Sequence, residues 1–410
     1  MKKVVVTGCG VVSPVGIGKK DFWRSLANGA SGVGPITQFD TENFDSKIAG
    51  EVADFNPSDF LSPKEQRRIP RFVQFSLKAA QEAIKEASVD LARVDPYQVG
   101  VIVGSGVGSL ETIEREHKVL LEKGPRRLSP FMIPMLITNE AAGHVAIRFG
   151  LKGPNFCTVT ACASGAHAIG EAYRVIKSGQ AKVMVCGGTE ACIVPLGVGG
   201  FCALKALSRR NSEPAQASRP FDRERDGFIM AEGAGMVVLE DFEHAKARGA
   251  QIYGELSGYG STCDAYHITA PDPEGRAAAK AMSSALAEAE LGKDKPIYLN
   301  AHGTSTPLND KMETNAIKLV FEKNLDNLAI SSTKSMTGHT LGAAGAIEFI
   351  SCCLALKNSL IPPTINYQYP DPECDLNYTP NQARELNISA CLSNSLGFGG
   401  HNASLLIEKI

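Results

Sequence analysis

Cys162 is one of three side chains whose types and settings point to chemistry. It follows the β-branched and aromatic run 156–160, which predicts a strand, and precedes a helical pattern of apolar residues over 169–176. We therefore expect the thiol at a strand-to-helix turn, where free N–H groups and the positive end of the helix dipole favour a thiolate. Small residues on both sides, at 161 and 163–165, would let an acyl group or a backbone donor approach the sulfur.

His302 and His339 are the other two. His302 directly follows the apolar run 297–301, which predicts a strand. Loops at the carboxyl ends of strands are where α/β folds bind ligands. His339 ends the polar segment 332–339 and precedes small residues that open a helical pattern. Taken singly, any of the three could be structural. Together they could also bind zinc, but four ligands with short spacings are absent, so we expect no metal. One thiolate with two imidazoles suits acyl transfer joined to stabilisation of an enolate.

Composition limits the classes of partner. The chain has 410 residues, which is long for one hydrophobic core and favours two domains or an internal duplication. Its 42 basic and 44 acidic residues give a net charge of −2, so no overall field attracts nucleic acid or anionic lipid. No uninterrupted apolar run approaches the roughly 18 residues of a membrane span. We expect neither a nucleic-acid partner nor a membrane span.

The cysteines argue against a disulfide-rich protein, and the N-terminal glycines argue against a dinucleotide-binding site. The 11 cysteines lie mostly in apolar or Gly-rich runs and form no CxxC pair. This pattern favours a reducing cytoplasm over a disulfide framework, so we expect a cytoplasmic protein. Gly8-Cys9-Gly10 follows a short strand but lacks the third glycine and the helix of a dinucleotide site. The three apolar residues 4–6 are too few for a secretion signal.

Apolar strands alternate with helical patterns along the chain. The run 181–186, for example, predicts a buried strand. Alternation of this kind indicates an α/β core with helices on both faces of a sheet. The second half repeats the plan, and segment 395–408 echoes segment 226–240 in its pattern. We therefore predict two related halves, residues 1–250 with the cysteine and residues 251–410 with the two histidines.

Four segments, in this order and spacing, closely resemble the β-ketoacyl-[acyl-carrier-protein] synthases, and the resemblance covers the whole chain. The segments are Thr160–Gly165, Asn300–Pro307, Lys334–His339 and Asn394–Asn402. The nearest branch is the type II synthase of dissociated bacterial fatty acid synthesis. The family implies the thiolase fold, an α/β architecture with duplicated halves in a five-layer αβαβα sandwich, working as a homodimer. It also implies decarboxylative condensation of an acyl-enzyme with malonyl-acyl carrier protein, without a cofactor.

The resemblance implies a role for each matching residue of the reaction centre. Cys162 would take the acyl chain from acyl carrier protein as a thioester. Its N–H group and that of Phe398 would form the oxyanion hole, and the Phe398 ring would gate the passage between the acyl and malonyl pockets. His302 and His339 would hold the malonyl thioester oxygen during decarboxylation and stabilise the enolate that attacks the acyl-enzyme.

Supporting and binding positions of the family also match. An organising role is implied for Lys334, paired with Glu348 and close to Glu313. The hydroxyls of Thr304 and Thr306 would hydrogen-bond the pantetheine arm of the carrier. Further substrate contacts are implied at Val107, Phe201 and Gly399. The carrier would dock on a basic set, for which a solvated charged face is the alternative: Lys64, Arg67, Arg68, Arg71, Arg209 and Arg210.

Three other functions share parts of this pattern. A ketosynthase of a polyketide or other specialised pathway uses the same cysteine and two histidines. A degradative thiolase pairs its nucleophile with one histidine and a second catalytic cysteine, which this chain does not offer in the Gly-rich loop. A non-catalytic chain-length partner subunit is a binding protein, and the intact Cys162 argues against it. Small departures from the family at Ala163, Leu396 and His401 concern substrate preference and not the reacting groups.

Overall fold

Two five-stranded sheets with the same strand order form the frame of the protein. The order is β6-β5-β7-β8-β1 in the first half and β11-β10-β14-β15-β9 in the second. In each sheet the first three strands run parallel and the last two pairings are antiparallel. The strands are β1 (Val4–Ser13), β5 (Val99–Gly104), β6 (Asn155–Thr158), β7 (Val183–Glu190), β8 (Gly233–Asp241), β9 (Gly254–Cys263), β10 (Ile297–Asn300), β11 (Leu328–Ser331), β14 (Ala390–Gly397) and β15 (His401–Glu408).

Strand for strand, the second sheet repeats the first. Strands β7 and β8 correspond to β14 and β15, and the match of β8 with β15 explains why segment 395–408 echoes segment 226–240 in sequence. The two sheets join edge to edge through a short pairing of β1 with β9 at Val5 and Val6. The predicted duplication is confirmed, while the boundaries 1–250 and 251–410 stay a prediction.

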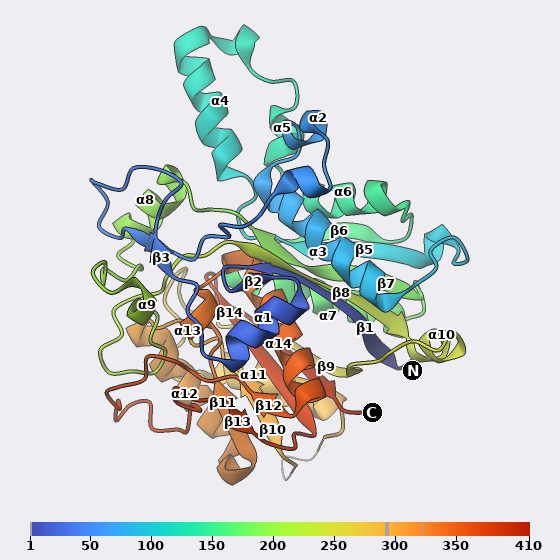
Figure 1. Ribbon diagram of the computed structural model, residues 1–410. Coiled ribbons are helices and arrows are strands. Elements are labelled where there is room, and N and C mark those ends of the chain that lie inside the picture. Colours follow the sequence, from blue (N-terminus) through green and yellow to red (C-terminus); the bar gives the residue numbers. More distant parts are fainter. Residues whose placement is uncertain (1, 292–294, 323) are drawn as a thin grey trace.

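Helices form three layers around the two sheets (Figure 1). One outer layer, on the first sheet, is α3 (Arg71–Ala87) with α6 (Glu140–Phe149). The central layer, between the sheets, is α7 (Ser164–Lys177) with α14 (Ala344–Asn358), and the other outer layer is α11 (Arg276–Glu288) with α12 (Pro307–Phe321). The computed structural model, which describes residues 2–291, 295–322 and 324–410, therefore has the predicted five-layer sandwich of the thiolase fold.

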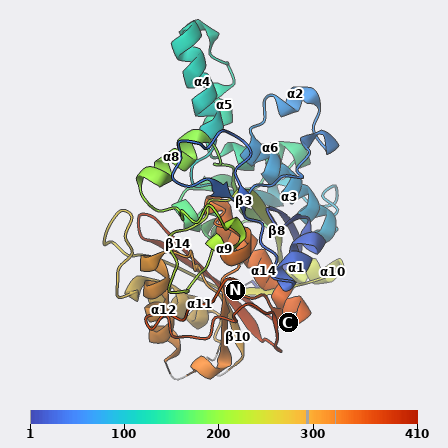
Figure 2. The same cartoon turned by 60° about the vertical axis from the view of Figure 1, so that its left-hand side comes forward.

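Shorter elements connect these layers. The helices are α1 (Lys19–Ala27), α2 (Pro63–Gln66), α4 (Leu110–Lys123), α5 (Met132–Leu136), α8 (Pro195–Ala203), α9 (Pro214–Ala217), α10 (Phe242–Ala247) and α13 (Lys334–Thr337). The short strands are β2 (Gly16–Ile17), β3 (Gly34–Pro35), β4 (Ile48–Ala49), β12 (Leu360–Ile361) and β13 (Arg384–Glu385). Two 3-10 turns matter for the site, η4 (Ala161–Ala163) and η6 (Leu341–Ala343). Helix α4 projects from the body in both views (Figure 1 and Figure 2).

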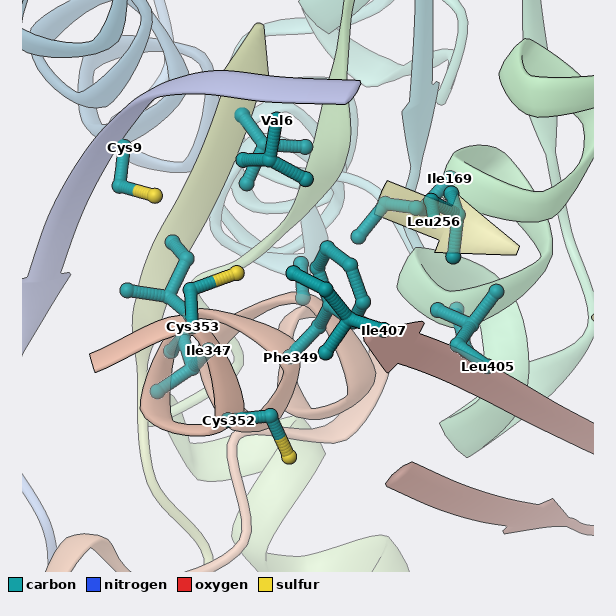
Figure 3. Packing of buried hydrophobic residues seen from close by; sticks show 14 of the residues in the cluster. Val6, Cys9, Ile169, Leu256, Ile347, Phe349, Cys352, Cys353, Leu405 and Ile407 are labelled. Atoms are coloured by element: carbon teal, nitrogen blue, oxygen red, sulfur yellow. The ribbon is translucent and has the colours of Figure 1, made fainter. Parts of the chain in front are cut away.

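The central helix α14 is buried on all sides. Its Ile347, Phe349 and Cys353 pack among Val6 and Ile407 from the strands of both halves (Figure 3). The helical segment Leu341–Asn358 is long and apolar enough to cross a membrane by length and composition, with a mean hydropathy of 1.3. However, 89% of it is buried inside the protein, as expected for a helix covered by a sheet on each face. This segment is the core helix of the sandwich.

The glycines of Gly8-Cys9-Gly10 lie inside a strand and not in a ligand-binding loop. Strand β1 continues through all three residues to Ser13. A Cβ on Gly10 would lie 2.0 Å from the Ala79 carbonyl oxygen, and one on Gly8 would lie 2.2 Å from the Ala83 carbonyl oxygen. Glycine is therefore needed at both positions because helix α3 packs directly on the strand.

Candidate active site

Cys162 lies in a tight elbow between strand β6 and helix α7. The elbow is η4, in which Ala161 has a left-handed backbone with φ 49°. Ser164 fixes this shape, because its Oγ accepts the Thr160 N–H at 2.9 Å and donates to the Ala161 carbonyl at 2.7 Å. The predicted strand-to-helix turn is confirmed, although the strand ends at Thr158, two residues earlier than expected.

Gly165 has a different role from the one that its sequence position suggested. A Cβ there would lie 2.9 Å from the Gly342 carbonyl oxygen and 3.2 Å from the Ala346 Cβ. The missing side chain lets helices α7 and α14 cross closely in the central layer. Gly165 therefore brings the two halves together and does not open a path to the sulfur.

Cys162, His302 and His339 line one cavity of 390 Å³, to which both halves contribute. The two imidazole centroids lie 5.3 Å apart, with the ring planes at 86°. His302 comes from the loop after β10, and His339 follows α13. The backbone of His339 is held on its other side, since its N–H donates to the Ile229 carbonyl at 2.7 Å. The three predicted side chains thus converge from distant parts of the chain.

Hydrogen bonds assign the same tautomer to both histidines. Nδ1 of His302 lies 3.2 Å from Nζ of Lys334, and Nδ1 of His339 accepts the Leu341 N–H at 3.2 Å. A lysine ammonium and a backbone N–H are both donors, so each Nδ1 acts as an acceptor and the proton of the neutral ring is on Nε2. Burial, with the charge of Lys334, holds the pKa of each imidazole well below its usual value. The cavity therefore contains two neutral Nε2–H donors.

Two buried carboxylates support His302. Glu348 is in direct contact with the Lys334 ammonium, and burial raises the Glu348 pKa to about 7 against the opposing effect of that ammonium. Glu313 accepts the backbone N–H groups of His302 and Gly303, each at 2.8 Å. The backbone and the ring of His302 are thus each held by a separate group, as an organising role for Lys334, Glu348 and Glu313 requires.

The acidity of Cys162 depends on opposing effects. Burial raises the pKa of its thiol to about 12, although the charge of Lys334 and the Phe398 N–H act in the opposite direction. Burial and the helix N-terminus therefore act on the thiolate in opposite directions, because desolvation disfavours a charge that the helix dipole favours. The expectation that the helix end favours a thiolate stays a prediction, which the pH profile of Cys162 alkylation tests.

Phe398 begins the short turn between β14 and β15 and lies at the cavity wall. It is 36% exposed, unlike an ordinary core phenylalanine, and its N–H points to the Cys162 sulfur. A Cβ on the preceding Gly397 would lie 3.2 Å from the Cys162 nitrogen, so this turn runs against the elbow. Gly399 and Gly400 follow with φ 85° and 76°, conformations that favour glycine.

Sequence comparison identifies the family to which this arrangement belongs. The profile described as Beta-ketoacyl synthase, N-terminal domain, matches residues 1–245, and the profile described as Beta-ketoacyl synthase, C-terminal domain, matches residues 253–368. The chain belongs to the beta-ketoacyl synthase family. It is 52% identical over 408 residues to the 3-oxoacyl-[acyl-carrier-protein] synthase 2 of Synechocystis sp., covering 100% of this chain and 98% of that one. It is 48% identical to the enzyme of the same name from Coxiella burnetii, covering 100% and 99%.

Solved structures of other beta-ketoacyl synthases have the same fold over their whole length. A beta-ketoacyl synthase from Burkholderia phymatum matches with a TM-score of 0.93 at 35% identity, covering 100% of both chains. A type II polyketide ketosynthase, solved in complex with its acyl carrier protein and bound to a hexaketide, matches with a TM-score of 0.91 at 38% identity, covering 100% of this chain and 99% of that one.

The structure divides the predicted substrate-binding residues into two groups. Thr304, Thr306 and Phe201 line the cavity, and the two threonine hydroxyls lie 2.9 Å apart. Val107 and Gly399 are not among the lining residues. They lie beside the site instead, because the Val107 N–H faces Glu190 at 3.4 Å and the Gly399 N–H donates to the Ile268 carbonyl at 2.7 Å.

The basic residues expected to bind the carrier protein differ in their exposure and in their ion pairs. Lys64, Arg67 and Arg68 are exposed near helix α2. Arg71, however, forms a two-point ion pair with the buried Glu232, with Nε to Oε2 at 2.8 Å and Nη2 to Oε1 at 2.6 Å. Its charge is already paired with a buried carboxylate, which argues against a docking role for Arg71, and that role stays a prediction. Arg209 and Arg210 stay partly exposed but pair with acidic residues: Asp45, Glu213 and Glu224.

Several cavity residues carried no recognisable signal in the sequence. Phe228 packs edge-on against His339, with centroids 5.2 Å apart, and also contacts Phe201. It is separated from His339 by more than a hundred residues, and only the β-bridge of the neighbouring Met230 to His339 brings them together. The buried carboxylate Glu190, at the end of β7, had no recognisable signal either. Apolar lining is also contributed by Leu204, Pro271, Leu308, Met312 and Leu341.

Metal ligands of the usual kinds are not gathered in the described part of the chain. No group of three or more His, Cys, Asp or Glu side chains there is arranged to hold an ion. All eleven cysteines are free thiols. The site is thus described by its thiol, its two imidazoles and their supporting charges.

Proposed function

We propose that this chain condenses an acyl group, carried as a thioester on Cys162, with malonyl-acyl carrier protein to give 3-oxoacyl-acyl carrier protein in fatty acid elongation. The observation that carries the proposal is the pair of Nε2–H donors of His302 and His339 in one cavity with the Cys162 thiol. A thiol alone would serve many transferases. Two neutral donors aimed into the same cavity add the means to stabilise an enolate oxygen.

The first half-reaction loads the enzyme. The Cys162 sulfur attacks the thioester carbonyl of the acyl carrier, and the bond from that carbon to the pantetheine sulfur breaks. The proton of the Cys162 thiol ends on the departing pantetheine thiolate, so no base is consumed. The N–H groups of Cys162 and Phe398, which lie at the elbow and the adjoining turn, would hold the oxyanion.

The second half-reaction makes the new carbon–carbon bond. The malonyl carboxylate leaves as carbon dioxide, and its bonding electron pair passes to the thioester to form an enolate. The Nε2–H groups of His302 and His339 would hold the enolate oxygen, and Lys334, at 3.2 Å from His302 Nδ1, would increase the donor strength of that ring. The enolate carbon attacks the acyl-enzyme, the bond from the acyl carbon to the Cys162 sulfur breaks, and the departing thiolate takes up one proton from solvent to restore the thiol.

The carrier would reach the site along one side of the cavity. Thr304 and Thr306 provide hydroxyls for the pantetheine arm, and the exposed Lys64, Arg67 and Arg68 provide positive charge for an acidic carrier. One structural relative of the family was solved with its acyl carrier protein, which supports a carrier as partner here. The substrates themselves bring the reactive groups, so the reaction as written needs no cofactor.

A homodimer is part of the proposal. Strand β6 ends its sheet with one edge unpaired in the described residues, and it exposes 40% of Phe156. Val159 (53%), which follows this strand, and Ile133 (59%) and Ile137 (38%), in helix α5 and just after it, expose further apolar surface. An exposed apolar edge strand is a liability unless another chain covers it. Light scattering of the protein and of Phe156→Glu tests this, since the variant should be monomeric.

Fatty acid elongation is favoured over a specialised pathway by degree of similarity. The relatives named 3-oxoacyl-[acyl-carrier-protein] synthase 2 are 48–52% identical, whereas the polyketide ketosynthase is 38% identical. The decisive test is incubation of the purified protein with malonyl-acyl carrier protein and with acyl carrier proteins that bear saturated acyl chains of graded length. We expect 3-oxoacyl carrier and carbon dioxide. Condensation only in the presence of a second subunit, or only with polyketide starters, would overturn this assignment.

A further inference from the structure

Glu190 is a fully buried carboxylate that no step of the reaction uses. It ends strand β7 beside the elbow of Cys162 and accepts hydrogen bonds from two separate segments. Its Oε2 accepts the Gly106 N–H at 2.7 Å and the Gly342 N–H at 3.1 Å, and its Oε1 accepts the Ser105 hydroxyl at 3.0 Å. One side chain thus joins the loop after β5 to the turn η6.

Both of these segments touch the cysteine side of the cavity. A Cβ on Gly106 would lie 3.4 Å from the Ala161 carbonyl oxygen, so the loop after β5 presses on the residue that precedes Cys162. Gly342 follows Leu341, which has a left-handed backbone with φ 48° and lines the cavity. If Glu190 no longer held these two segments, the wall around the sulfur would move.

Glu313 holds the equivalent loop in the other half. Its carboxylate accepts the N–H groups of His302 and Gly303 in the loop after β10, which corresponds to β5 in the repeated fold. Each half therefore uses one buried carboxylate to fix the loop that follows its central parallel strand. The Glu313 loop carries a malonyl-side histidine, and the Glu190 loop borders the acyl-side elbow.

We propose that Glu190 is a positioning residue for acyl transfer, which holds loop 105–107 and turn 341–342 against the Cys162 elbow and matters much less for malonyl decarboxylation. This inference rests on the proposed function. The backbone of His339 is held independently of Glu190, by hydrogen bonds of 2.7 and 2.9 Å with Ile229 and Ala231, while its ring accepts the N–H of Leu341 in the turn that Glu190 holds. A negative charge on Glu190 opposes ionisation of the nearby thiol, although burial raises the pKa of the Glu190 carboxyl itself, and this gives the residue an electrostatic signature beyond its packing.

Glu190→Gln keeps the size of the side chain but removes the charge and replaces one acceptor by a donor. We expect kcat/KM for acylation by a long-chain acyl carrier to fall at least tenfold, and carbon dioxide release from malonyl carrier to stay within about threefold of wild type. Alkylation of Cys162 by iodoacetamide should shift to lower pH, since a charge that disfavours the thiolate is gone. Ser105→Ala loosens the same loop but keeps the Glu190 carboxyl, so a larger shift in Glu190→Gln than in Ser105→Ala would identify the effect of the charge.

Two further variants keep the test decisive. Ser105→Ala removes one partner of Glu190 and should weaken acylation selectively even if Glu190→Gln does not fold. Glu240→Gln is the control. Glu240 is a buried carboxylate near the C-terminal end of β8 that pairs with Arg248, and its substitution should leave the ratio of the two half-reactions unchanged. Equal loss of both half-reactions in Glu190→Gln and Ser105→Ala, or wild-type acylation in both, would overturn the inference. Absence of acylation in the wild-type protein would instead refute the proposed function.

Discussion

Nζ of Lys334 lies 3.2 Å from Nδ1 of His302 and contacts Glu348 at the same time. This buried ammonium therefore determines which nitrogen of His302 carries the proton, and directs the Nε2–H into the cavity. His339 reaches the same state by a different route, through the Leu341 N–H. Two unrelated contacts thus produce two equivalent donors. Substitution of either histidine should therefore impair decarboxylation and leave acylation of Cys162 in place, which separates the two half-reactions experimentally.

The first prediction concerns that separation. His302→Ala should keep acylation of Cys162 but lose decarboxylation of malonyl carrier by about 10²–10³-fold, the usual effect of removing one donor from a charge-stabilising site. His339→Ala should behave alike. Cys162→Gln should still decarboxylate but not condense, because it fills the acyl position with a neutral amide. The measurements are carbon dioxide release and intact-mass detection of acyl-enzyme. Normal decarboxylation by His302→Ala would refute the assignment of the two donors.

The second prediction concerns the pH dependence of the thiol. Cys162 has a raised pKa, so at neutral pH its alkylation rate follows the small thiolate fraction. Lys334 lowers this pKa, and Lys334→Met should raise it, slowing alkylation at pH 7 by about 3–10-fold and moving the whole profile to higher pH. The exposed Cys263 provides an internal reference whose alkylation should not change. An unchanged Cys162 profile would show that the lysine charge does not reach the sulfur.

The location of the three reacting residues was predictable because each stands at the end of a strongly patterned element. Cys162 lies between an apolar strand and a helix, and His302 follows a buried strand, so local pattern sufficed to place them. Even the duplication had a local signal in the echo of two segments. The matching left-handed backbones of Ala161 (φ 49°) and Leu341 (φ 48°) were not predictable, since neither residue is glycine.

The features that the sequence did not predict share a cause. Burial and contacts between residues far apart in the chain leave no mark in the local sequence pattern. Arg71 belongs to a basic run, but its partner Glu232 lies 161 positions away and neutralises it. Cys162 has the helix N-terminus that favours a thiolate, yet burial acts in the opposite direction and raises its pKa, and that burial has no local signal in the sequence. Glu190 gained its role in the same way, through Gly342 in the other half.

The third prediction separates the exposed basic residues from Arg71. Arg68→Glu should raise KM for the acyl carrier, with a penalty that shrinks at high salt, because an exposed charge acts through a screened field. Activity on a small pantetheine thioester should hardly change. Arg71→Met should instead lower the free energy of unfolding by about 3 kcal/mol, since it leaves the Glu232 carboxylate buried and unpaired. An Arg71→Met variant that is stable but defective only with the carrier would reverse this division.

The fourth prediction tests the close contact between strand β1 and helix α3. Gly10→Ala places a methyl group 2.0 Å from the Ala79 carbonyl oxygen, and backbone on both sides must move to admit it. We expect the free energy of unfolding to fall by about 3 kcal/mol, near the upper end for overpacking. Gly34→Ala is the matched control, because a Cβ there meets nothing within 4 Å and should change stability by less than about 0.5 kcal/mol. Chemical denaturation of both variants measures the difference. Comparable stabilities would mean that α3 can shift freely on the sheet, and that the glycines of β1 are not required for its packing.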